Sequence, residues 1–115
     1  MKEFLFVFRT DYMTMMKNPP SPEEMQAMTK KWMDWMGGIA AQNIPFERGN
    51  RLSFDGKVVK PNNVVTDGPY TEIKESIGGY SKISVDSYEK AVAIAKGCPI
   101  LTVGGNVEIR EINQM

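Results

Sequence analysis

Apolar residues fall into blocks along the chain, and the spacing within each block predicts an element. The first block is a continuous apolar run at residues 4–8, with the sequence FLFVF. A run of this length is typical of a strand buried on both faces. It therefore predicts a central strand with another part of the protein covering each side. Residues 10–20 lack such a pattern and are predicted to be a loop.

A helix is predicted after this loop, because its start signals are complete. Ser21 is the expected N-cap, Pro22 takes the first helical position and Glu24 completes a capping box. Apolar residues then recur at spacings of three and four and form one face. They are Met25, Met28, Trp32, Trp35, Met36 and Ile39. The pattern resumes after a pair of glycines, so the helix is predicted to continue to Asn43.

The middle of the chain carries the spacing of short strands. Residues 46–54 are predicted to form a strand. The pair Asp55-Gly56 is favoured in two-residue hairpin turns, so residues 57–60 are predicted to return along that strand. Residues 64–66 are then expected to be a short extended piece that ends at Asp67.

The last part of the chain predicts a strand, a helix and a further strand. Residues 79–86 form the strand, and Asp86 is the expected N-cap of the helix, with Glu89 at its capping-box position. Gly97 is expected to end this helix. Residues 106–112 alternate apolar and polar side chains, which is typical of a half-exposed strand.

This order of elements predicts an α+β domain with a ferredoxin-like βαββαβ core. Its length of 115 residues fits one domain spanning residues 1–115. Both helices are expected to cover one face of the sheet, which leaves the other face without a cover. A partner subunit is the natural cover, so the protein is predicted to be a homodimer.

Composition restricts the chemistry. The chain has no histidine, which excludes an imidazole base, a Ser-His-Asp site and the common zinc sites. It has one cysteine, Cys98, which excludes an intrachain disulfide and is expected to be an inert thiol at a helix end. No metal and no cofactor are expected. Fourteen basic residues balance fourteen acidic ones, so nucleic acid is not an expected partner.

The early apolar run also bears on location. Residues 4–8 are too few for the core of a signal peptide, and no apolar stretch reaches the length that spans a bilayer. The protein is therefore predicted to be cytoplasmic, with no membrane partner.

Several separated motifs resemble the YCII-related family and, more narrowly, its DGPF-domain branch. They are SPEEM at residues 21–25, KWMDWMGG at 31–38, VTDGPY at 65–70, AKGCPI at 95–100 and GGNVEIR at 104–110. Tyr70 stands where the branch usually has Phe. The resemblance covers almost the whole chain. It implies a dimeric α/β barrel, in which two subunits place their sheets face to face, and a cavity between helices and sheet near the DGPF segment.

The resemblance implies no particular activity. Some members of the wider family have a His and Asp pair proposed to act in catalysis, and this chain lacks any histidine. The DGPF branch is associated with sigma factors of the extracytoplasmic-function type. The chain has no sigma domain, so a regulatory link is expected to act in trans.

Five residues are candidates for a ligand site, namely Arg9, Trp32, Asp67, Tyr70 and Lys74. Asp67 is the best candidate for an acid or base, with Tyr70 as a wall and hydroxyl donor and Lys74 as a neutralising cation. Arg9 ends the first strand, where it can pair with a carboxylate, and Trp32 supplies an apolar wall. The structural alternatives are a turn for Asp67, a solvated loop for Lys74 and the core for Trp32.

The sequence leaves the function open between different classes. One is a dimeric domain of possible regulatory role that binds a small polar or anionic molecule. Another is a cofactor-free enzyme that uses Asp67 as acid or base on a small cyclic or carbonyl substrate. A third is a purely structural partner. The enzyme requires a closed pocket with a perturbed carboxylate, whereas the binding domain requires only the pocket.

Overall fold

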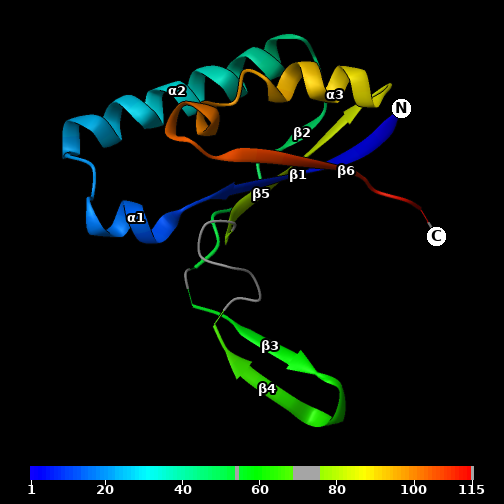
Figure 1. The fold of residues 1–115 in the computed structure, drawn as a ribbon. Helices are drawn as coiled ribbons and strands as arrows, with labels where there is room; N and C mark the ends of the chain where they lie inside the picture. The colour runs from blue at the N-terminus through cyan, green and yellow to red at the C-terminus, as the bar shows by residue number, and fades with distance from the viewer. Residues whose placement is uncertain (54, 69–75, 115) are drawn as a thin grey trace.

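The computed structural model describes residues 1–53, 55–68 and 76–114. The helices and strands, in chain order, are β1 (Lys2–Thr10), α1 (Tyr12–Lys17), α2 (Pro22–Ala41), β2 (Phe46–Glu47), β3 (Lys57–Lys60), β4 (Val64–Asp67), β5 (Ser76–Val85), α3 (Tyr88–Ala95) and β6 (Asn106–Glu111). Short 3-10 turns lie at Pro61–Asn63 and Pro99–Val103. The fold therefore mixes helices with strands, as an α+β domain does (Figure 1).

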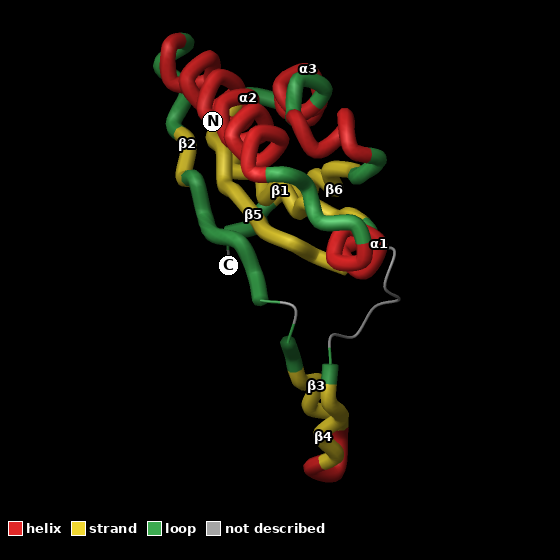
Figure 2. Tube along the Cα trace, turned by 90° about the vertical axis from the view of Figure 1, so that its left-hand side faces the viewer, coloured by secondary structure: helices red, strands yellow, loops and turns green. Residues whose placement is uncertain are grey.

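Within the described residues, four strands form an antiparallel sheet in the order β2-β5-β1-β6. β1 is central and pairs along its length with β5 on one side and β6 on the other. Helices α2 and α3 both lie over one face of this sheet, as Figures 1 and 2 show. Neither of these two helices covers the opposite face.

Alternation along β1 builds the core. Successive side chains of a strand point to opposite faces, so Phe4, Phe6 and Phe8 all point toward the helices and are nearly or completely buried. The indole of Trp32 on α2 meets Phe8 edge-on, with 5.1 Å between ring centroids. The hydrophobic core therefore occupies the space between the sheet and α2 and α3.

The alternate side chains of β1 point to the uncovered face. Val7 is only 9% exposed there, and Tyr80 and Glu108 stand directly opposite it on the neighbouring strands. The prediction that residues 4–8 are buried on both faces is confirmed for Val7. Among the described residues, Tyr80 and Glu108 flank it on this face.

Residues 10–20, predicted to be a loop, contain α1. Its start is capped by Asp11, whose carboxylate accepts hydrogen bonds from the backbone N–H and the hydroxyl of Thr14, at 3.1 and 2.7 Å. The helix ends before Asn18, which precedes a proline and is therefore disfavoured in helical geometry. The loop prediction was wrong because this capping signal was overlooked.

Helix α2 starts with the predicted capping box, in which Ser21 and Glu24 bond each other's backbone N–H groups. It continues through both glycines, as predicted, and ends at Ala41, two residues before the expected end. Met25 was predicted on the apolar face and is instead 55% exposed. The reason is that α2 packs against the core from Trp32 onward, so its first turns contact little of it.

The hairpin turn lies elsewhere than predicted. β3 pairs with β4, not with residues 46–54, and the chain reverses at Pro61–Asn63 instead of Asp55-Gly56. Asn62 and Asn63 have φ values of 66° and 60°, a left-handed geometry that Asn tolerates better than most residues.

Within residues 46–53, the described part of this predicted strand, regular strand structure is confined to β2. Gly49 has φ of +68°, and a Cβ atom there would lie 1.9 Å from the carbonyl oxygen of Tyr80. The backbone therefore approaches β5 so closely at this position that a residue with a side chain would not fit. The chain still runs along β5, and Arg51 forms an isolated bridge to it. Phe54, the predicted end of the strand, lies outside the described residues.

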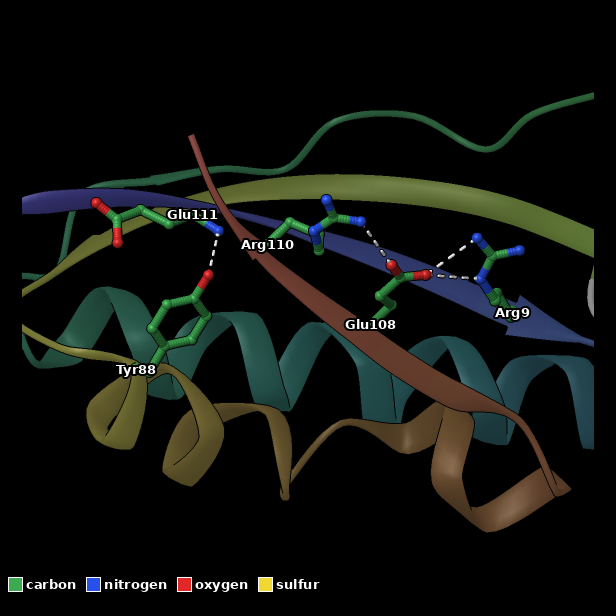
Figure 3. Close-up of polar contacts among 5 residues, drawn as sticks. All are labelled: Arg9, Tyr88, Glu108, Arg110 and Glu111. Carbon is green, nitrogen blue, oxygen red and sulfur yellow. Dashed lines mark hydrogen bonds and ion pairs between the residues drawn. The ribbon is translucent and has the colours of Figure 1, made fainter. Parts of the chain in front are cut away.

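The first turn of α3 is tied to the edge of the sheet. Ser87, not Asp86, is the N-cap, because its hydroxyl accepts the backbone N–H of Lys90 at 3.2 Å. The hydroxyl of Tyr88 accepts the backbone N–H of Glu111 at 2.8 Å (Figure 3). The ring of Tyr88 also packs edge-on against Phe4, with centroids 4.7 Å apart.

Candidate functional site

The sheet surface turned away from α2 and α3, which we call the open face, is the main candidate for a site. Its side chains come from every strand of the sheet. They include Glu3, Leu5, Val7 and Arg9 of β1, Tyr80 and Lys82 of β5, Glu108 and Arg110 of β6, and Glu47 of β2. In the described part of the chain, the charged side chains form two clusters with apolar side chains between them.

The first cluster centres on Glu108 (Figure 3). Nε and Nη2 of Arg9 lie 3.1 and 3.0 Å from one carboxylate oxygen, and Nη1 of Arg110 lies 3.2 Å from the other. Hydrogen bonds from Arg110 and then Arg9 hold the pKa of Glu108 below its ordinary value of 4.5. The Arg110 side chain is the most exposed of the three, at 73%.

The second cluster centres on Lys82. Its ammonium lies 2.8 Å from a carboxylate oxygen of Glu3 and 3.5 Å from one of Glu47, which stands directly opposite it on β2. The hydrogen bond to Glu3, followed by the charge of Glu3, raises the pKa of Lys82 above its ordinary value of 10.5. This cluster pairs one cation with two carboxylates.

Apolar side chains cross the middle of the open face between the clusters. Val7 and Tyr80 stand opposite each other on β1 and β5, and Leu5 lies two residues before Val7. Tyr80 is 38% exposed. The open face therefore combines an apolar middle with charged flanks, which is the usual anatomy of a protein surface that meets a partner.

The structure places Arg9 and Trp32 on opposite sides of the sheet. Arg9 reaches Glu108 on the open face, whereas Trp32 packs against Phe8 on the helical side. Phe8 and Arg9 are consecutive in β1, so their side chains point to opposite faces of the sheet.

Asp67 lies in a third place, at the end of β4. Its side chain is 89% exposed and forms an ion pair with Lys57 of β3. Figure 1 shows this hairpin apart from β1 and α2. The remaining candidates, Tyr70 and Lys74, lie outside the described residues. Within one subunit, the structure therefore does not bring the described candidates Arg9, Trp32 and Asp67 together.

Sequence reasoning missed the partners of Arg9. The alternation in residues 106–112 already placed Glu108 and Arg110 on one side of the last strand. Their pairing with Arg9 depends on the register between β1 and β6, in which Val7 stands opposite Glu108. That register joins residues almost a hundred positions apart and has no local signal.

Surface hollows are found on the helical side of the molecule. One, of about 350 Å³, lies between α2 and α3 and is lined in part by Trp35, Gln42 and Lys90. Another, of about 420 Å³, lies on the outer surface of α2 between Met25 and Met33. Neither is lined by Arg9, Trp32 or Asp67. Across residues 1–53, 55–68 and 76–114, no group of three or more acidic or cysteine side chains is arranged to hold a metal.

The fold and the open face define a small α+β domain with one uncovered sheet surface. A family model described as the YCII-related domain matches residues 10–115. The chain therefore belongs to the YCII-related family. Among curated proteins, none matches the sequence significantly. Of the helices that the structure describes, none is long and apolar enough to cross a membrane.

We expect Glu108→Gln to reveal a pH-dependent contribution to folding. A carboxylate whose pKa is lowered by folding stabilises the native state above its ordinary pKa, and this contribution is lost as the pH falls through the lowered value. The mutant should be less stable than the wild type at pH 7, and the difference should shrink below about pH 4.5. Urea unfolding from pH 7 to pH 3 measures this difference.

The control is Asp55→Asn, which removes an exposed carboxylate from the segment before β3. If the difference in the free energy of unfolding between Glu108→Gln and the wild type stayed constant from pH 7 to pH 3, this would contradict the role assigned to the two arginines.

Cys98 is expected to be unreactive in the folded protein. The side chain is 2% exposed, and burial raises the pKa of its thiol to about 11. The thiolate is the reactive species, so iodoacetamide at pH 8 should label Cys98 only after denaturation. Mass spectrometry of native and urea-treated protein checks this, and rapid labelling of the native protein would show that the core around α3 opens.

Proposed function

We propose that the chain is a dimeric small-molecule-binding domain in which two open faces pack together. The observation that carries this proposal is the open face itself, which neither α2 nor α3 covers. The strand order β2-β5-β1-β6, with α2 after β1 and α3 after β5, supports a ferredoxin-like arrangement. That arrangement and the resemblance to the DGPF branch both favour a dimeric α/β barrel.

The charges of the open face favour pairing with a second copy. In both clusters the cations are paired with carboxylates, so two identical faces can meet with little repulsion. In a dimer with a two-fold axis, the same surface of each copy contacts its counterpart on the other copy. Pairing would also remove Tyr80 and Leu5 from water, which is favourable for apolar surface.

The ligand we propose is a small carboxylate with an apolar body, held between the two sheets. Arg110 is the most exposed member of the cluster around Glu108, and its side chain is 73% exposed. Guanidinium groups bind carboxylates through paired hydrogen bonds, and Val7 and Tyr80 offer apolar contact beside them. A ligand bound between subunits would stabilise the dimer by mass action, which suits a regulatory role.

An enzyme that uses Asp67 gains less support. A carboxylate needs burial or a special charge environment to work as an acid or base near neutral pH. Asp67 is 89% exposed and paired with Lys57. The buried, unpaired thiol of Cys98 is consistent with a reducing compartment, and we place the dimer in the cytoplasm.

Light scattering at micromolar concentration should give the mass of a dimer. Tyr80→Lys should weaken the dimer at least tenfold, because it puts a cation in the apolar middle of each open face. The matched control is Val92→Lys on α3, a side chain that is also 38% exposed. A monomeric wild type, or an equal effect of both variants, would refute the face-to-face dimer. Circular dichroism confirms that each variant is folded.

Benzoate titration tests the ligand class, with benzyl alcohol as its uncharged counterpart. Benzoate should bind and benzyl alcohol should bind much more weakly, because only the former offers a carboxylate to Arg110. Arg110→Gln should weaken benzoate binding at least tenfold, or about 1.4 kcal/mol. Lys31→Gln, on the exposed side of α2, should leave it unchanged. Equal affinity for both probes would exclude a carboxylate site here.

A further inference from the structure

We propose that the hairpin of β3 and β4 is an arm that packs along the second copy of the chain in the dimer. The arm consists of residues 57–67, from Lys57 to Asp67. This inference rests on the proposed dimer and adds a second contact surface to it, outside the open face.

The position of the arm is the first support. Figure 1 and Figure 2, which are turned by 90° about the vertical axis, both show the arm on the side of the sheet opposite α2 and α3. That is the side of the open face. A second copy that covers the open face must therefore stand beside the arm.

The overall dimensions agree with a projecting arm. The radius of gyration is 15.7 Å, against about 13 Å for a compact domain of this length. Within the described part of the chain, β3 and β4 make their main contacts with each other. The arm is thus held away from the core that α2, α3 and the sheet enclose.

The reach of the arm is sufficient for contact with a partner. It pairs Lys57–Lys60 with Val64–Asp67, which gives a length of about 13 Å. Two sheets packed face to face are about 10 Å apart. An arm that starts near the end of one sheet and projects on its open side therefore reaches past the layer of the partner's sheet.

The arm carries apolar side chains that its own subunit does not bury. Val59 is 75% exposed and faces Val65, which is 54% exposed, across the two strands. Val64 is 48% exposed on the arm's other side. A two-stranded hairpin in water is at best marginally stable alone. Valines on both sides, together with little packing in the same subunit, indicate a surface that is buried by another chain.

The size of the open face gives an independent reason. If every strand were as long as the nine-residue β1, a sheet four strands wide would measure about 19 by 30 Å, and two such faces would bury roughly 1,100 Å². This is an upper bound, because β2 has two residues and β6 has six. Stable interfaces usually bury about 1,200 to 2,000 Å² in total. The open face alone lies at or below the lower limit, and two arms would raise the buried area into the usual range.

The charges of the arm fit a copy of this chain. Asp67 neutralises Lys57, and the remaining cation of the paired strands is Lys60. One positive charge is far from the basic patch that nucleic acid requires. A weakly charged arm with exposed valines instead suits the partly apolar surface of a second copy.

The decisive variant is Val59→Thr combined with Val65→Thr, which keeps β-branched side chains of similar shape and makes them polar. It should raise the dissociation constant of the dimer at least tenfold by sedimentation velocity. Val92→Thr on the exposed side of α3 is the control and should leave the constant unchanged. Circular dichroism and urea unfolding at a concentration where the protein is monomeric should be the same for all three proteins.

Amide hydrogen exchange in the arm separates the possible failures. Arm amides should be protected at concentrations where the wild type is dimeric and should exchange rapidly in Tyr80→Lys, where the dimer is weakened. Equal protection in both would mean that the arm packs on its own subunit, which overturns the proposal. A wild-type dimer with unprotected arm amides and an unchanged constant in the double variant also overturns it, while the face-to-face dimer stands. A monomeric wild type refutes both proposals at once.

Discussion

Strand β1 pairs with β5 on one side and with β6 on the other, and the alternation of its side chains assigns a task to each face of the sheet. Phe4, Phe6 and Phe8 require a helical layer above them, and α2 and α3 supply it. The residues between them set the character of the open face. Because a shift of one residue in register would exchange these two sets, the pairing of β1 determines both the core and the candidate site.

The ion pairs of the open face lie partly in solvent, and such pairs contribute only about 0 to 1 kcal/mol each. Pairing within each cluster keeps these charges from standing alone beside the apolar side chains of the open face. In the dimer that we propose, each chain would therefore fold first and associate afterwards, which is the order that a ligand-dependent assembly requires.

Much of the fold could be predicted from local signals. The capping box at Ser21, the phenylalanine run of β1 and the alternation in β6 each act within a few residues, and each led to the correct type of element. The errors arose where two suitable signals competed. Asp55-Gly56 and Asn62-Asn63 both favour a turn, and the choice between them depends on which strands pair.

The candidate site was less predictable for the same reason. Asp67 was expected at a cavity because it ends an extended segment and because the resemblance implies a cavity near the DGPF segment. Pairing of β3 with β4 instead carries Asp67 onto the hairpin, beside Lys57. Likewise, Arg9 was identified from its place at a strand end, but its partner Glu108 follows only from the long-range register of β6.

The hydroxyl of Tyr88 has a consequence for how the molecule behaves at high concentration. β6 is an edge strand, and outward-pointing N–H groups on an edge can recruit a strand from another molecule and begin open-ended aggregation. By accepting the N–H of Glu111, Tyr88 occupies one of these donors with a side chain fixed by its packing on Phe4. A single phenol thus makes this end of the sheet a poorer template for fibre growth.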